Sequence, residues 1–160
     1  MRMLLVMSLT LGWNTRQVDF SNAFVQADLN KHVYLTLPQY FESEEGLTSQ
    51  EAVLKLNKSI YVLVQSFMYW FYFLSQKWNS FGFYTSNQEP CLFFGRGMII
   101  VMYVDDCLFF GPDGTKIDKL IQELQDSGMK LTKEDEDVFH FLGVTVDQKS
   151  DGRIELLQQG

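Results

Sequence analysis

Two adjacent carboxylates, Asp105 and Asp106, interrupt a long apolar stretch of this sequence. They stand in VMYVDDCLFF, residues 101–110, where β-branched, aromatic and aliphatic side chains favour a packed strand. Ionised carboxylates are disfavoured in such surroundings unless a cation or hydrogen bonds compensate them, and each raises the pKa of the other. The chain must therefore lift both acids into water at a sharp turn, or hold a metal ion beside them.

The flanking residues predict a hairpin that carries both acids at its tip, one on each side of the pleat. The strand-like stretch 98–104 leads into the pair, and 107–111 leads away from it. A third acid, Asp19, stands at the end of another apolar, strand-like segment. Three carboxylates from two strands suit a pair of divalent cations, because Mg²⁺ prefers hard oxygen ligands and two such ions hold the attacking and leaving oxygens in line. Taken alone, an Asp-Asp pair is more often a solvated turn.

The rest of the chain predicts helices mixed with mostly hairpin-linked strands, and hence an α+β fold. Apolar spacing of three and four residues predicts a buried helix that closes near Gly82, and an amphipathic helix that ends at Gly128. The acidic stretch 42–51 is expected to be an exposed loop, and so is the acidic turn 133–138. Helices are expected over 2–11, 66–83 and 114–127, and strands over 16–25, 33–37, 53–63, 90–95, 98–104, 107–111, 138–146 and 153–157.

Composition limits the class of protein. The 160 residues are 46% apolar, enough for one core, so we expect one domain or part of one. A net charge of −7 offers no overall basic field for nucleic acid. The two cysteines form no metal or disulfide framework, which favours a reducing compartment. The apolar opening lacks a cleavage signal and is too short to span a bilayer, so we expect an intracellular protein, cytoplasmic or nuclear, without membrane contact.

The motifs in their order and spacing resemble the reverse transcriptase, or RNA-dependent DNA polymerase, of copia-type retrotransposons. They are QVDFSNAF, VYLTLP, VLKLNKSIYVLVQS, PCLFF, VMYVDD and FLGVTV, and they cover nearly the whole chain. The resemblance implies a polymerase palm in which Asp19, Asp105 and Asp106 are both the catalytic residues and the ligands of Mg²⁺ or Mn²⁺. It also implies template-primer and deoxynucleoside triphosphates as partners of the intact enzyme, and nucleotidyl transfer by a two-metal mechanism.

The same resemblance implies further site residues. Ala23 and Phe24 match the nucleotide site, where an aromatic ring under the sugar would clash with a 2′-hydroxyl; ordinary strand packing is the alternative. Gln65 matches a glutamine that faces the nucleotide, and its alternative is a solvated residue at the start of a helix. Phe141, Leu142 and Gly143 match the hairpin that grips the primer end. Lys130 is a loose match to a lysine near the departing pyrophosphate, with an ordinary surface lysine as its alternative.

The resemblance also implies the domain organisation. We expect a single incomplete reverse transcriptase domain over residues 1–160, in which 1–25 belong to the palm and 26–61 form the returning part of the fingers. Residues 62–160 would complete the palm and add the primer-grip hairpin. The chain looks like a fragment, because the upstream fingers, the thumb and the ribonuclease H segment are missing from it.

The chain departs from the family at the entry to one helix. The family shows a pattern like SLYGLKQAPRAW where this chain has SIYVLVQSFMYW. Val62 replaces a glycine, Val64 a lysine, Phe67 a proline and Met68 an arginine, and the lost basic side chains would have contacted phosphates. Three interpretations of function therefore stay open: a polymerase module, a catalytically inactive transposon remnant, and a small interaction domain that retains the palm fold.

Overall fold

The structure is a computed structural model that describes residues 2–38, 52–61, 63–134, 138–141, 144–149, 151 and 153–158. The chain forms two compact units, one of Met1–Ala23 with Leu74–Gly160 and the other of Phe24–Phe73. The boundaries fall within the short helix α2 (Ala23–Gln26) and the long helix α3 (Ser66–Ser80). In the described part of the chain, no helix is long and apolar enough to cross a membrane.

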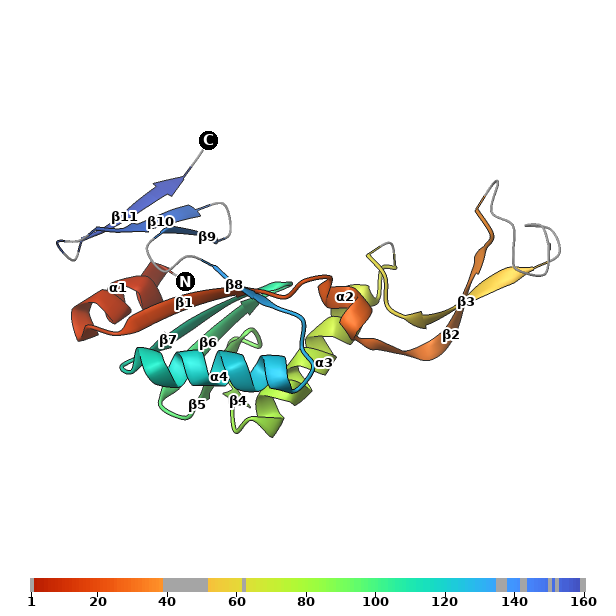
Figure 1. The fold of residues 1–160 in the computed structure, drawn as a ribbon, viewed down its shortest axis with the longest axis horizontal. Helices are drawn as coiled ribbons and strands as arrows, with labels where there is room; N and C mark the ends of the chain where they lie inside the picture. Colours follow the sequence, from red (N-terminus) through yellow and green to blue (C-terminus); the bar gives the residue numbers. More distant parts are fainter. Residues whose placement is uncertain are drawn as a thin grey trace. The chain divides into compact units, whose positions relative to one another are not determined.

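The first unit is built on a six-stranded sheet in the order β4-β5-β6-β7-β1-β8 (Figure 1). Every neighbouring pair of strands in it is antiparallel. This order places β1, from the start of the chain, directly beside β7, which begins at the Asp pair. The strands are β4 (Tyr84–Thr85), β5 (Leu92–Gly95), β6 (Met98–Tyr103), β7 (Asp106–Gly111), β1 (Asn14–Asp19) and β8 (Thr132–Lys133).

Helix α1 (Arg2–Leu11) covers one face of this sheet. Its Leu5 packs against Ile99 of β6 and against Leu108 and Phe110 of β7. These side chains share a face because residues two apart in a strand point the same way. The helix ends before Gly12, whose φ of +63° is left-handed and suits glycine.

The opposite face packs against α3 and α4 (Gly114–Asp126). Trp78 of α3 is fully buried, and its ring centroid lies 6.5 Å from that of Phe93 and 5.8 Å from that of Phe109. Helix α4 buries the apolar stripe that its sequence predicts, namely Ile117, Leu120, Ile121 and Leu124. Cover on both faces explains why β6 and β7 are apolar almost throughout.

A three-stranded antiparallel sheet in the order β11-β10-β9 follows in the same unit. It consists of β9 (Val138–Phe141), β10 (Val144–Gln148) and β11 (Ile154–Gln158). Phe141 pairs with Val144, so the prediction of one strand over 138–146 is wrong: the chain reverses direction within it. The two halves carry the same kind of alternating pattern, which cannot show a reversal.

The second unit contains a hairpin of β2 (Asp28–Thr36) and β3 (Val53–Lys58). Strand β2 begins five residues before the predicted strand 33–37, and β3 ends well before residue 63. The predicted acidic loop 42–51 lies outside the described residues. The predicted mixture of helices and hairpin-linked antiparallel strands is confirmed by the two units together.

Candidate metal centre

The β1–β7 ladder brings Asp19 to the Asp pair. Asp19, the last residue of β1, is directly opposite Asp106, the first residue of β7. Directly paired residues of antiparallel strands project from the same face of a sheet. The backbone N–H of Phe20 also donates a hydrogen bond to the carbonyl oxygen of Asp105 over 2.7 Å. The end of β1 is thereby joined to the turn that carries the Asp pair.

A two-residue turn, Val104–Asp105, connects β6 to β7. Tyr103 pairs with Asp106 across the hairpin, so Asp105 lies in the turn while Asp106 already belongs to the strand. The prediction that both acids occupy the tip is therefore wrong for Asp106. Val104 has a φ of +54°, at a turn position that usually takes glycine. A β-branched residue held in the left-handed region stores about 1–3 kcal/mol of strain, and such strain concentrates at functional sites.

Burial and mutual repulsion weaken the acidity of two of the carboxyl groups. The pKa of Asp19 is raised by partial burial and by the charges of Asp105 and Glu134. Burial raises the pKa of Asp106, and the charges of Asp105, Asp19 and Glu134 raise it further. A hydrogen bond from Gln17 acts in the opposite direction and lowers this pKa. A cation placed among these carboxylates would relieve the repulsion that raises both pKa values.

Gln17 supports Asp106 from within the sheet. Its side chain is only 4% exposed, and its Nε2 donates a hydrogen bond to Asp106 Oδ1 over 3.0 Å. Gln17 lies two residues before Asp19 and therefore on the same face of β1. Sequence reasoning missed this residue, although its spacing from Asp19 was a usable signal.

Glu134 adds a fourth carboxylate from the other side of β1. Strand β8 pairs with β1 through Asp19 and Thr132, and the backbone N–H of Glu134 donates to the carbonyl oxygen of Gln17 over 3.1 Å. Glu134 is exposed, as the predicted acidic turn implied, yet its charge raises the pKa of both Asp19 and Asp106. Only the pairing of β8 with β1 reveals this proximity, so the sequence alone gave no signal for it.

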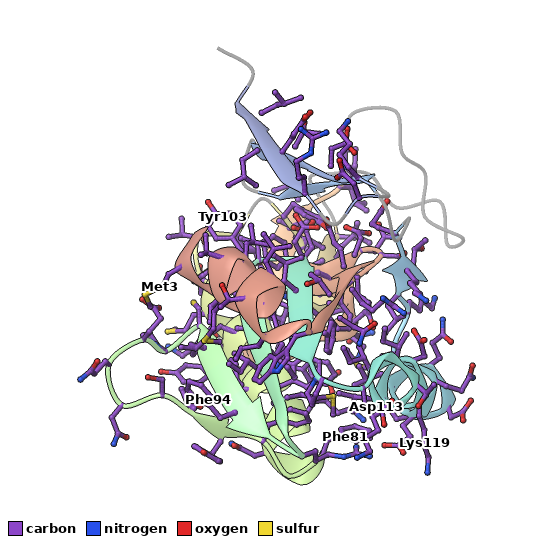
Figure 2. All side chains as sticks on the ribbon, turned by 90° about the vertical axis from the view of Figure 1, so that its left-hand side faces the viewer. Met3, Phe81, Phe94, Tyr103, Asp113 and Lys119 are labelled. Atoms are coloured by element: carbon purple, nitrogen blue, oxygen red, sulfur yellow. The ribbon has the colours of Figure 1, made fainter. Side chains whose placement is uncertain are left out.

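On the same sheet face, the residues of β6 and β5 that lie next to Asp106 are apolar. Tyr103, its partner across the hairpin, lines an apolar pocket of about 470 Å³ together with Met3 of α1 (Figure 2). Leu92 and Val101 contribute to the same pocket. At this end of the face, the side chains therefore change from apolar at Leu92, Val101 and Tyr103 to acidic at Asp106 and Asp19.

The chemistry of this acidic edge suits a divalent cation, since hard carboxylate oxygens are the ligands that Mg²⁺ prefers. Among the described residues, however, no group of three or more His, Cys, Asp or Glu side chains already lies in an arrangement that could hold a metal ion. The backbone thus places Asp19, Asp105 and Asp106 at one sheet edge, and their side chains would have to turn toward a common point to share an ion.

The other predicted site residues are placed as follows. Ala23 and Phe24 are buried, and the ring of Phe24 contacts Tyr61 at a centroid distance of 4.5 Å. Gln65 is exposed, one residue before α3 begins. Phe141 ends β9, whereas Leu142 and Gly143 lie outside the described residues. Their roles at a nucleotide or a primer stay predictions.

An antiparallel sheet with helices on both faces is compatible with a reverse transcriptase domain. The family model described as "Reverse transcriptase (RNA-dependent DNA polymerase)" matches residues 1–159 of the chain. The chain therefore belongs to this family.

Its relatives are transposon polyproteins. The chain is 33% identical over 147 residues to the retrovirus-related Pol polyprotein from transposon RE2 of Arabidopsis thaliana, a match that covers 89% of the chain and 10% of that polyprotein. It is 30% identical over 151 residues to the Pol polyprotein from transposon TNT 1-94 of Nicotiana tabacum, covering 83% of the chain and 11% of that polyprotein. The Ty1-BL Gag-Pol polyprotein of Saccharomyces cerevisiae is 25% identical over 152 residues, 89% of the chain and 8% of that protein. The resemblance to copia-type elements is confirmed, and the chain spans about a tenth of the length of these relatives.

Proposed function

We propose that this chain supplies the metal-binding carboxylates of an RNA-dependent DNA polymerase, which joins deoxynucleotides to a primer by a two-metal mechanism. The observation that carries the proposal is the direct pairing of Asp19 with Asp106, with Asp105 in the adjoining turn. Two bound Mg²⁺ or Mn²⁺ ions would supply positive charge to the attacking hydroxyl and the leaving pyrophosphate. Family membership supports the assignment of this reaction to the intact enzyme.

The roles of the individual residues follow from their positions. Asp19, Asp105 and Asp106 would hold the ions, and the raised pKa values of Asp19 and Asp106 make ion binding compete with protonation. Gln17 donates to Asp106 and so keeps its carboxylate ionised and oriented. Glu134 adds negative charge on the same side of the sheet, which strengthens attraction for a cation without requiring direct contact.

We assign the remaining roles from the resemblance to the family. Residues 1–25 and 62–160 would form the palm, and 26–61 the returning part of the fingers. Phe24 would lie under the sugar of the incoming nucleotide, and Ala23 and Gln65 would line its site. Phe141, Leu142 and Gly143 would contact the primer end. The partners would be a template-primer and deoxynucleoside triphosphates.

A second candidate is an inactive remnant that keeps the fold. The observation that favours it is the exposed apolar surface at the start of α3, where Val64 is 97% exposed and Phe67 and Met68 are about half exposed. Copia-type relatives carry lysine, proline and arginine at these positions. Exposed apolar side chains cannot replace the phosphate contacts of a lysine and an arginine.

Two measurements test the proposal. Mn²⁺ added to the isotope-labelled chain should broaden the amide signals of Asp19, Asp105 and Asp106, and a D105N/D106N variant should lose this effect. The matched control is Asp126→Asn on α4, which removes one exposed charge and should change nothing. Broadening that is equal in the wild type and in D105N/D106N would refute the metal centre.

The second measurement separates an active segment from a remnant. Residues 1–159 replace the matching segment of the TNT 1-94 relative, and primer extension is measured with RNA template and Mg²⁺. Extension by this chimera, lost in its D105N/D106N form, supports the polymerase. A chimera that folds and binds Mn²⁺ but does not extend supports the remnant.

A further inference from the structure

An open groove with aromatic walls lies on the six-stranded sheet, at the end away from the metal centre. Trp13, Tyr84, Phe94 and Arg96 line it, and its volume is about 500 Å³. Phe94 lies near the β5–β6 turn, whereas Tyr103 ends β6 beside the Asp pair, at the other end of the same hairpin (Figure 2). We call this site the aromatic groove. It shares no residue with the metal centre.

The rings of the aromatic groove lie on one face of the sheet. Tyr84 of β4 is directly opposite Phe94 of β5, so their side chains project from the same face. The two ring centroids are 5.9 Å apart with an angle of 30° between the planes. Trp13, which precedes β1, packs against the same apolar cluster as Phe94. Because the Tyr84 side chain is 64% exposed, this row of rings is accessible to a partner.

The polar groups of these rings can donate hydrogen bonds. The indole N–H of Trp13 is a donor only, and the hydroxyl of Tyr84 can donate or accept. In the part of the chain that the structure describes, neither group is engaged in a hydrogen bond. A partner that buries these groups must therefore bring acceptors to them, since a buried donor without an acceptor is costly.

The aromatic groove is electrically neutral. Among the described residues that line it, Arg96 alone is charged, and its guanidinium donates two hydrogen bonds to the Glu123 carboxylate of α4 over 2.7 and 3.3 Å. A cationic partner would meet this guanidinium, and an anionic partner would be repelled by a chain whose net charge is −7. The charge of the groove therefore matches an uncharged partner that carries carbonyl acceptors.

We propose that the aromatic groove binds an uncharged proline-rich segment in the polyproline II conformation. Such a segment presents backbone carbonyl acceptors, and its prolines have no N–H that would be buried against donors. Pyrrolidine rings pack on aromatic side chains, and grooves lined by aromatic residues are a recurring binding site for proline-rich segments. An ordinary extended peptide would bring N–H groups and would lose more conformational freedom. The inference goes beyond the polymerase function and does not depend on it.

Trp13 provides a reporter for the test. Of the three tryptophans, Trp70 and Trp78 are fully buried, whereas Trp13 is partly exposed. The full chain, labelled with ¹⁵N, is titrated with octaproline capped at both ends. The indole N–H signal of Trp13 should shift with a Kd on the order of 100 μM, and the other two indole signals should not move. A capped glycine-serine peptide of the same length is the control and should shift none of them.

Two variants test the contacts. Tyr84→Ala should weaken octaproline binding by about ten-fold, because the most exposed ring of the groove is lost. The matched control is Tyr72→Ala on α3, which removes a tyrosine that is 57% exposed and should leave the affinity unchanged. Trp13→Phe keeps a ring but removes the N–H donor, and should weaken binding by about five-fold. Anisotropy of a dye-labelled octaproline measures these affinities, and thermal unfolding checks that each variant is folded.

Several outcomes would overturn the proposal. Equal affinities for octaproline and the glycine-serine peptide would remove the preference for proline, and equal affinities of Y84A and Y72A would place the peptide elsewhere. A Trp13 signal that shifts with protein concentration alone would identify a second copy of the chain as the occupant. A shift with tetramethylammonium chloride but not with octaproline would identify a cation site instead. The D105N/D106N variant should bind octaproline as the wild type does, so this test is independent of the metal centre.

Discussion

The side-chain amide of Gln17 donates a hydrogen bond to the carboxylate of Asp106 over 3.0 Å, and Gln17 is almost fully buried while it does so. This contact links the interior of β1 to the first residue of β7. It favours the ionised form of Asp106, whose pKa is raised by burial and by the neighbouring acids. Gln17 is therefore placed to orient the carboxylate of Asp106, one of the proposed ion ligands.

Replacing Gln17 by leucine should raise the pKa of Asp106 further, because the bond that favours the charged form is lost. Unfolding should become easier by about 1 kcal/mol, part of the roughly 1.5–3 kcal/mol of a hydrogen bond to a charged group. Carboxyl carbon signals followed during an NMR pH titration report the pKa. The matched control is Gln122→Leu, which removes an exposed amide-to-carboxylate bond of 2.9 Å to Asp126 and should shift neither quantity appreciably. An unchanged Asp106 pKa in Q17L would remove the positioning role.

Asp106→Asn should stabilise the metal-free chain at neutral pH by about 0.5–1 kcal/mol, the size of a partly screened charge pair. The folded-state pKa values of Asp19 and Asp106 are raised, so the native state binds more protons than the unfolded state just above the ordinary carboxyl pKa. Stability of the wild type should consequently rise as pH falls from neutral toward about 4, and D106N should flatten this rise. Thermal unfolding at a series of pH values measures both effects. The control is Asp126→Asn, which removes an exposed charge and should change neither. A D106N chain that is less stable than the wild type at pH 7 would contradict the repulsion.

At Asp118 of α4, the pH dependence of stability should have the opposite sign, because the pKa of this carboxyl group is lowered. Partial burial raises its pKa, but hydrogen bonds and charges from Lys133 and Arg16 outweigh this and leave the pKa lowered; the two contacts to Oδ1 measure 2.9 and 3.2 Å. Its contribution is fully present above the unfolded pKa of about 3.9 and is lost as pH falls through the lower folded value. Asp118→Asn should therefore lower stability at pH 7 by at most about 1 kcal/mol, because the carboxylate is well exposed. The deficit should vanish in acid, and urea titrations at pH 7 and below pH 3 measure it. A deficit that is equal at both pH values would assign the effect to packing instead.

The sequence predicted the helices and strands of the fold better than it predicted which strands pair with one another. Apolar spacing was sufficient for α4, since every member of its buried stripe follows the helical repeat. It could not show that Glu134 lies beside Gln17, because that neighbourhood depends on the pairing of β8 with β1, more than a hundred residues apart. Alternation alone also could not separate β9 from β10, because both strands carry the same pattern. Local patterns specify local geometry, whereas the acidic site depends on long-range pairing.

Gly95, which pairs with Met98 across the β5–β6 hairpin, lies so close to neighbouring backbone that it has no room for a side chain, a constraint that the sequence does not show. A Cβ at Gly95 would collide with the backbone oxygen of Gly82 and would lie 2.8 Å from Phe83 Cα. Gly95→Ala should therefore lower stability by about 3 kcal/mol, as overpacking against rigid backbone does. The control Gly12→Ala enters open space at a φ of +63°, so it should cost only about 1 kcal/mol of conformational strain. Chemical denaturation compares the two variants, and equal losses would mean that the close approach at Gly95 relaxes freely.

A polypeptide of these 160 residues alone should not extend a primer at a useful rate. Phosphoryl transfer depends mostly on positioning and charge stabilisation, and three carboxylates at one sheet edge provide only part of either. The chain spans about a tenth of the polyproteins that it matches, and its net charge of −7 repels a polyanion everywhere except near local cationic sites. Exposed Val64 and Met68 add apolar surface at the entry to α3 in place of the basic side chains of the family pattern that the sequence resembles. The assay incubates the purified chain with a primed RNA template, deoxynucleotides and Mg²⁺ or Mn²⁺, beside the D105N/D106N variant. Extension by the wild type that disappears in this variant would show that this chain alone suffices to hold the substrates in line.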